Sequence, residues 1–134
     1  MCKPGIVVSA GPIRLTKLAA HRLLIESEQS GTGLMYSRWL KSIGVQPGSA
    51  LRSNNLIARI GMTVSGLGIS YLPLKCVGPL VNDGRLQVLK VTPRLPDVVY
   101  VAMHKREQRG SLFSSIVGFA REACDFDRMF QAVG

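Results

Sequence analysis

Apolar residues recur along this chain in two alternating patterns: helical spacing, and short continuous runs. The clearest example is the segment 51–74, LRSNNLIARIGMTVSGLGISYLPL. Within it, Leu56, Ile57, Ile60 and Val64 fall on one face of a helix, because residues three or four apart share a helical face. The segment therefore predicts an amphipathic helix followed by a buried strand.

The ends of these two elements carry local signals of their own. The hydroxyl of Ser53 is expected to cap the start of the helix by accepting a backbone N–H. Gly66 follows the last periodic residue, where a left-handed cap needs no β-carbon. Gly68 is expected to allow a second sharp turn before an apolar strand at 69–72, which Pro73 ends. Together they predict one helix–strand unit of an α/β domain.

The same two patterns predict the other elements. Helices are expected where apolar residues have helical spacing, at 15–20, 34–43, 74–80 and 111–124. Strands are expected at the short apolar runs 5–10, 22–27, 50–52, 86–91 and 98–104. An Asp-Gly turn is expected within 81–85, and residues 125–134 are expected to form a tail. Strands that alternate with helices indicate an α/β fold with a mostly parallel sheet.

The composition fits one packed domain, since 46% of the 134 residues are apolar. No apolar run is long enough to span a bilayer, and residues 1–12 lack the apolar region of a signal peptide. We therefore expect a cytoplasmic protein with no membrane partner. The formal net charge is +9, but the basic residues are scattered. This pattern favours a solvated surface biased toward anionic partners over a dedicated DNA groove.

The sequence predicts neither a metal site nor catalytic residues. Cys2, Cys76 and Cys124 are widely spaced and form no CxxC pair, and His21 and His104 lie near no cysteine in the sequence. Reduced thiols are the expectation for such a set. The histidines also have no evident nucleophile partners, so we expect a protein that is not an enzyme and holds no cofactor.

The first candidate binding site is the loop 27–33, SEQSGTG, which joins the end of a predicted strand to the start of a predicted helix. Such loops present free backbone N–H groups and the positive end of the helix dipole, which suit a carboxylate or phosphate. The expected ligand contacts are Ser27, Glu28, Ser30, Gly31 and Thr32. The alternative is that Ser30 or Thr32 only caps the helix. The loop lacks the ending of a phosphate-binding P-loop.

An acidic residue in or near an anion site would be unusual. Glu26 and Glu28 therefore imply either a side chain that points outward or a ligand that carries hydrogen-bond donors.

The second candidate site is the turn 65–68, SGLG, with Ser65, Gly66 and Gly68 as the expected ligand contacts. The alternative is that this turn is only a helix exit. An effector held between this turn and the loop 27–33 is the specific prediction.

The pattern VSGLGISYLP within residues 51–74 resembles a segment of the effector-binding domain of LysR-type transcriptional regulators. Residues 14–25, RLTKLAAHRLLI, resemble the family's L-x-D-L-x-x-x-P-L-I segment, with Lys17 in place of an acidic residue and Arg22 in place of proline. Weaker matches follow in the family's order at 83–89 (DGRLQVL), 99–105 (VYVAMHK) and 112–126.

The resemblance implies a fold like that of periplasmic binding proteins, with two Rossmann-like lobes and a ligand cleft between them. Only the C-terminal part of such a domain is implied, with a lobe two and an incomplete lobe one. The implied division is 1–22 as the late part of lobe one and the crossover, 23–90 as lobe two, 91–126 as the return to lobe one, and 127–134 as a tail.

The resemblance also implies a function: sensing of a small anionic effector for a bacterial transcription regulator. In the family, the small hydroxyl residue that matches Ser65 lies near the cleft. The implied partners are the effector, a second copy that pairs through the effector domains, and DNA through a helix-turn-helix that this sequence does not contain. The alternative is a small α/β enzyme or a periplasmic-type anion-binding protein.

We predict that this chain does not bind DNA in a sequence-selective way. Selective binding needs side chains that reach base edges from an element placed in a groove, and the sequence shows no recognition-helix motif. Fluorescence anisotropy with two unrelated duplexes should give equal affinities that fall steeply as salt rises. A clear preference for one duplex at physiological salt would overturn this assignment.

Overall fold

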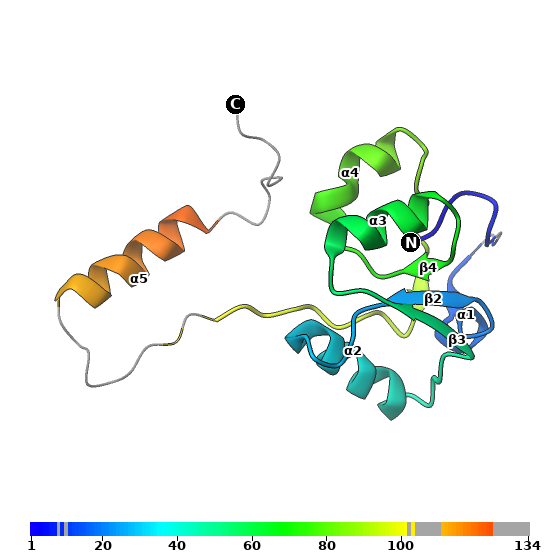
Figure 1. Cartoon of the computed structure of the whole chain (residues 1–134), viewed down its shortest axis with the longest axis horizontal. Coiled ribbons are helices and arrows are strands. Elements are labelled where there is room, and N and C mark those ends of the chain that lie inside the picture. The colour runs from blue at the N-terminus through cyan, green and yellow to red at the C-terminus, as the bar shows by residue number, and fades with distance from the viewer. Residues whose placement is uncertain (8, 10, 102, 104–110, 125–134) are drawn as a thin grey trace. The chain divides into compact units, whose positions relative to one another are not determined.

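The computed structural model describes residues 1–7, 9, 11–101, 103 and 111–124. These residues belong to two compact units, Met1–Pro96 (unit 1) and Asp97–Gly134 (unit 2). Each unit is described by itself below (Figure 1).

Unit 1 is built on a parallel sheet of three strands: β2 (Arg22–Ile25), β3 (Ser49–Arg52) and β4 (Ile69–Ser70). Their order is β3-β2-β4, with Leu23 paired to Ala50 on one side and to Ile69 on the other. Leu24, in the central strand, is fully buried. The predicted parallel sheet is therefore confirmed.

Helices connect these strands in the predicted alternation: α2 (Gly31–Ser42) between β2 and β3, and α3 (Leu56–Val64) between β3 and β4. The helix α4 (Leu74–Asn82) follows β4. The first crossover moves from β2 to its neighbour β3, and the second moves back across β2 to β4. Right-handed crossovers in opposite directions place their helices on opposite faces of a sheet. Figure 1 shows α3 on one side of the sheet and α2 on the other.

A second, two-stranded parallel sheet joins β1 (Ile13–Arg14) to β5 (Val91–Thr92), next to the short helix α1 (Leu15–Leu18). The strand predicted at 5–10 is wrong for residues 5–7, which form a turn and bends around Gly5 at φ 88°, and for residue 9, which has no regular structure. Residues 8 and 10 lie outside the described part. The strand predicted at 86–91 is reduced to β5 and to a single antiparallel bridge between Cys2 and Gln87.

Two clusters of buried side chains form the core of unit 1. The first comprises Cys2, Val7, Ile13, Leu18 and Ile69. The second comprises Leu72, Val77 and Leu86, and partly buried residues of α3 and α4 pack against it. The predicted inner face of α3 is correct for Leu56, Ile60 and Val64 but wrong for Ile57, which is 55% exposed. Arg59 and Thr63 are buried on this helix instead.

Two helix ends differ from the prediction. The helix α3 begins after Asn55, whose side chain accepts from Ala58 N at 3.0 Å, while Ser53 Oγ accepts from Asn55 N. The helix α4 continues through Gly78 and Pro79 to Asn82, although glycine and proline disfavour helix interiors by roughly 1 and 3 kcal/mol. Val77, one turn into this helix, is fully buried in the second cluster. Packing of this apolar face therefore outweighs the local signals.

In unit 2, the predicted helix is confirmed as α5 (Ser111–Ala123). The predicted strand at 98–104 is not formed by residues 98–101 and 103, and Val99 and Met103 are 80% and 89% exposed. Within the described residues no neighbouring strand pairs with this segment, so its backbone has no ladder to join. Residues 102 and 104, and the predicted tail at 125–134, lie outside the described part. The helices that the structure describes include none that is long and apolar enough to cross a membrane.

Two glycines near β4 occupy positions where a side chain would be strained or would clash. Gly66 has φ 81°, which confirms the predicted left-handed cap after α3. Gly68 has no positive φ, so the predicted second sharp turn is not its role. A β-carbon at Gly68 would overlap the carbonyl oxygen of Arg22 and lie 3.2 Å from Leu24 Cγ. Gly68 therefore allows the chain to approach β2 closely.

We predict opposite effects for two glycine-to-alanine changes. Gly68→Ala should lower the free energy of unfolding by about 1–3 kcal/mol, because the added methyl group pushes β4 away from β2. Gly61→Ala is the matched control, since Gly61 lies inside α3 with nothing near its β-carbon position. It should raise the free energy by roughly 0.5–1 kcal/mol. Urea unfolding of the three proteins measures both, and equal stability of Gly68→Ala and wild type would refute the close approach.

Candidate functional site

The end of β2 leads directly into the first turn of α2. Ser30 is the N-cap of α2, and its Oγ accepts from Gly33 N at 2.9 Å. This confirms the capping interpretation of the loop 27–33. The cap starts the helix at Gly31, three residues before the predicted start.

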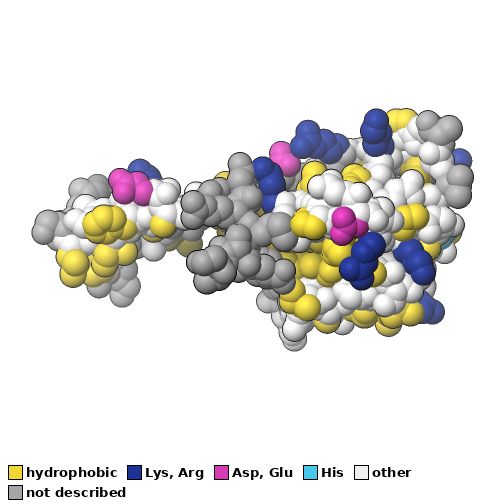
Figure 2. All heavy atoms as spheres, turned by 90° about the horizontal axis from the view of Figure 1, so that it is seen from above, with side chains coloured by type: hydrophobic (Ala, Val, Ile, Leu, Met, Phe, Trp, Pro, Cys, Tyr) yellow, Lys and Arg dark blue, Asp and Glu magenta, His cyan; other side chains and the backbone are white. Residues whose placement is uncertain are grey.

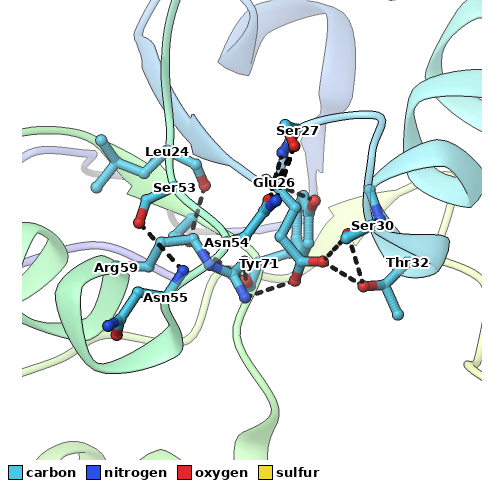
Figure 3. Close-up of polar contacts among 12 residues, drawn as sticks. Leu24, Glu26, Ser27, Ser30, Thr32, Ser53, Asn54, Asn55, Arg59 and Tyr71 are labelled. Atoms are coloured by element: carbon cyan, nitrogen blue, oxygen red, sulfur yellow. Dashed lines mark hydrogen bonds and ion pairs between the residues drawn. The ribbon is translucent and has the colours of Figure 1, made fainter.

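The carboxylate of Glu26, just after β2, points into this turn (Figure 3). Its Oε2 accepts from Ser30 Oγ at 2.5 Å and also from Thr32 Oγ1. Its Oε1 accepts from Arg59 Nη2 at 2.6 Å. Hydroxyl groups from α2 and a guanidinium from α3 therefore converge on one carboxylate that belongs to the chain itself.

Arg59 is held in place by several elements. The residue is 3% exposed, and its Nη1 donates to Tyr71 O at 3.3 Å. Its guanidinium carbon lies 5.4 Å from the centroid of the Tyr71 ring, a cation–π distance. Tyr71 Oη accepts from Glu26 N at 3.0 Å. Polar contacts thus join the ends of β2 and β4 to α2 and α3.

These contacts set the ionisation of the site. Partial burial opposes the charge of Glu26, but the hydrogen bonds from Ser30 and Thr32 and the charge of Arg59 outweigh it, so its pKa lies below the usual 4.5. Burial raises the pKa of Tyr71, and the nearby Glu26 carboxylate adds to this effect. At neutral pH the site therefore holds an ionised Glu26 and a neutral Tyr71.

The other predicted residues of the loop have separate partners. Ser27 N donates to Asn54 Oδ1 at 2.9 Å, and Asn54 Nδ2 donates to Ser27 Oγ at 2.8 Å. Glu28 is exposed and accepts from Ser37 Oγ at 2.6 Å, with Lys41 Nζ 3.5 Å away. Glu28 is thus the outward-pointing acid that the sequence allowed, whereas Glu26 points inward.

A pocket of about 170 Å³ opens beside this network at the carboxyl ends of β2 and β3. Polar or aromatic side chains line much of it, including Glu26, Glu28, Tyr36, Ser37, Lys41, Gln46, Arg52 and Tyr71. The rings of Tyr36 and Tyr71 pack with their centroids 4.3 Å apart. Glu28 is the predicted site residue that lines the pocket.

The turn 65–68 lies at the opposite end of the sheet. Ser65 ends α3 and is exposed, and Gly68 contacts Arg22, the first residue of β2. The loop 27–33 instead follows Ile25, the last residue of β2. In a parallel sheet, helix-to-strand turns and strand-to-helix loops lie at opposite edges. One small effector held between the two predicted sites is therefore incompatible with this fold, and Ser65, Gly66 and Gly68 stay predictions for a separate surface.

Arg59 and Tyr71 are site residues that the sequence did not predict. A signal existed, because Arg59 lies within the apolar stretch LIARI and shares a helical face with Leu56 and Thr63. A charged residue on the inner face of a helix needs a partner of opposite charge. Among the described residues, no group of three or more His, Cys, Asp or Glu side chains could hold a metal ion. His104 lies outside the described residues.

We predict that Glu26 stabilises the protein at neutral pH and ceases to do so in acid. Because its folded-state pKa is lowered, this contribution is complete above the usual Glu pKa of 4.5 and is lost as the pH falls through the folded-state pKa. Glu26→Gln should lower the free energy of unfolding at neutral pH by about 1.5–3 kcal/mol, with a difference that shrinks in acid.

Urea unfolding at a series of pH values measures this difference. Glu28→Gln is the matched control, because that side chain is exposed and should change stability little. A difference between wild type and Glu26→Gln that does not vary with pH would contradict the prediction.

Comparison with known proteins agrees with the resemblance seen in the sequence. The family model of the LysR substrate binding domain matches residues 1–125. Searches of curated proteins and of solved structures found no significant match. The family implies a periplasmic-binding-protein-like α/β fold and a regulatory ligand-binding role, and the parallel strands and alternating helices of unit 1 agree with that fold. This chain belongs to the family of LysR substrate-binding domains, the effector-binding modules of LysR-type transcription regulators.

Proposed function

We propose that this chain is the ligand-sensing module of a LysR-type regulator and that it binds a small anionic effector in the pocket beside β2 and β3. The observation that carries the proposal is this pocket, because it lies at the carboxyl ends of parallel strands and has cations on its rim. Its volume of about 170 Å³ is below the roughly 300 Å³ at which drug-sized ligand sites begin. The effector is therefore a small molecule.

Arg52 and Lys41 are the groups that attract the effector's charge. Both are exposed and line the pocket, and among the described residues Arg52 forms no salt bridge, although its charge contributes to the lowered pKa of Glu28. Lys41 contacts Glu28, which holds it near the rim. The hydroxyl groups of Ser30 and Thr32 already donate to Glu26. The effector's anion is therefore expected at Arg52 and Lys41 rather than at the start of α2.

The charge distribution of the chain supports an anionic effector. Residues 1–96 hold 12 of the 17 Lys and Arg residues but 3 of the 8 Asp and Glu residues, so the whole excess of +9 lies in unit 1. In the view of Figure 2, Lys and Arg side chains are spread over the surface instead of forming one patch. A broad positive potential raises the local concentration of small anions without forming a DNA groove.

We propose that the chain responds to its effector as part of a transcription regulator in the cytoplasm. Effector binding shifts the balance between two arrangements of paired effector domains, and a DNA-binding domain of the same regulator reports the shift. The coupling energy must come from contacts that the effector makes better in one arrangement than in the other. Tyr36 of α2 and Tyr71, which follows β4, line the pocket with their rings packed together, and we propose them as residues that an effector contacts.

The proposal is tested by calorimetric titration with a panel of small carboxylates. Arg52→Gln should weaken binding of the best ligand about tenfold or more, because a hydrogen bond to a charged group contributes roughly 1.5–3 kcal/mol. Arg38→Gln is the matched control, since Arg38 is an exposed arginine of α2 that does not line the pocket. If the affinity falls equally in Arg52→Gln and Arg38→Gln, the ligand is attracted by the overall charge of the chain. That result would contradict a specific site at Arg52.

A further inference from the structure

The carboxylate of Glu26 is held as a bound carboxylate ligand would be held. Three side chains converge on its two oxygens, namely the hydroxyls of Ser30 and Thr32 on Oε2 and the guanidinium of Arg59 on Oε1. We propose that Ser30, Thr32 and Arg59 form a carboxylate-binding site and that Glu26 of the same chain is its resident ligand. When the Glu26 carboxylate is removed, this site takes a small free carboxylate.

The hydroxyl groups of Ser30 and Thr32 are oriented by the chain itself. Ser30 Oγ accepts from Gly33 N, so its own proton is directed away from that N–H and toward the carboxylate. The two hydroxyls come from the N-cap and the first turn of α2, where the positive end of the helix dipole favours an anion. The amino end of a helix is not sufficient for a binding site. Here a buried cation, Arg59, also contacts the same carboxylate.

That cation, Arg59, depends on Glu26 for its counter-charge. Its side chain is 4% exposed, and its Nε atom has no hydrogen-bond partner among the described residues. A buried guanidinium without a counter-charge is strongly unfavourable. Arg59 donates through Nη1 to the neutral carbonyl of Tyr71, so the negative charge at this place comes from Glu26. A free carboxylate would restore that charge if Glu26 were shortened.

The site borders the pocket through Glu26, which lines it and whose side chain is 13% exposed, whereas Ser30, Thr32 and Arg59 do not line it. We therefore expect a small ion to approach the position of the carboxylate from the Glu26 side. In the wild-type chain the position is filled, and a carboxylate effector is directed to the pocket rim instead. The inference concerns a different set of residues from the proposed effector site at Arg52 and Lys41. Either can fail without the other.

Thermal unfolding in sodium formate and in sodium chloride, at equal ionic strength, tests the inference. Glu26→Ala should melt below wild type in chloride. Formate at ten times its dissociation constant should raise the melting temperature of this variant by roughly 5–10 °C. The wild-type protein should melt at nearly the same temperature in both salts, because its own carboxylate fills the site.

Two matched variants separate a specific site from a general salt effect. Glu26→Gln keeps the volume of the side chain and should not respond to formate, because its amide fills the position. The double variant Glu26→Ala with Arg59→Met should also not respond, because it lacks the cation. If Glu26→Ala is unfolded in chloride, it should refold as formate is added, as followed by circular dichroism.

Glu26→Ser repeats the measurement in a milder background, since its hydroxyl can still accept one hydrogen bond. Absence of a formate effect in both Glu26→Ala and Glu26→Ser would overturn the inference. An equal formate effect in wild type or in Glu26→Gln would overturn it as well. Binding of effector at Arg52 is read out separately by calorimetry on the wild-type chain, so the two outcomes are distinguishable.

Discussion

A buried arginine, Arg59, constrains the rest of this structure. Arg59 lies on the inner side of α3, where an unpaired charge would be far less stable than an apolar residue. Its Nη2 atom lies 2.6 Å from Glu26 Oε1. This ion pair requires the end of β2 to lie beside α3. The Tyr71 carbonyl and ring approach the same guanidinium, which ties the end of β4 to it as well. This one charge therefore joins α3 to the segments that follow β2 and β4.

The pairing also changes what the neighbouring loop can do. Donor groups at the start of a helix ordinarily suit an external anion. Here the hydroxyls of Ser30 and Thr32 are directed at Glu26, so an internal anion takes the place of an external one. The same arrangement leaves Arg52 and Lys41 as the exposed cations of the pocket. For this reason we propose that an effector is recognised at Arg52 and Lys41 of the pocket and not at the start of α2.

Topology adds a second constraint, on which surfaces can share a ligand. All three strands of the main sheet run parallel, so each strand-to-helix loop is at one edge and each helix-to-strand turn is at the other. The loop after β2 and the turn before β4 are both rich in serine and glycine, and they look alike as sequence. Gly68 contacts the first residue of β2, whereas Ser27 follows its last residue. Direction along the sheet separates the two segments.

The sequence by itself determined the features that depend on near neighbours in the chain. These include the left-handed cap at Gly66, a helix cap by Ser30 or Thr32, the helix α5, the alternation of strands and helices, and the family. Only the tertiary structure decided that Arg59 is buried and Ile57 half exposed, because the partner of Arg59 is Glu26, 33 residues earlier. It also decided that α4 passes through Pro79, since the packing of Val77 outweighs local propensity. Hydrophobic spacing predicts which face of a helix can be buried, but the pairing of charges distant in the chain determines which residues are buried.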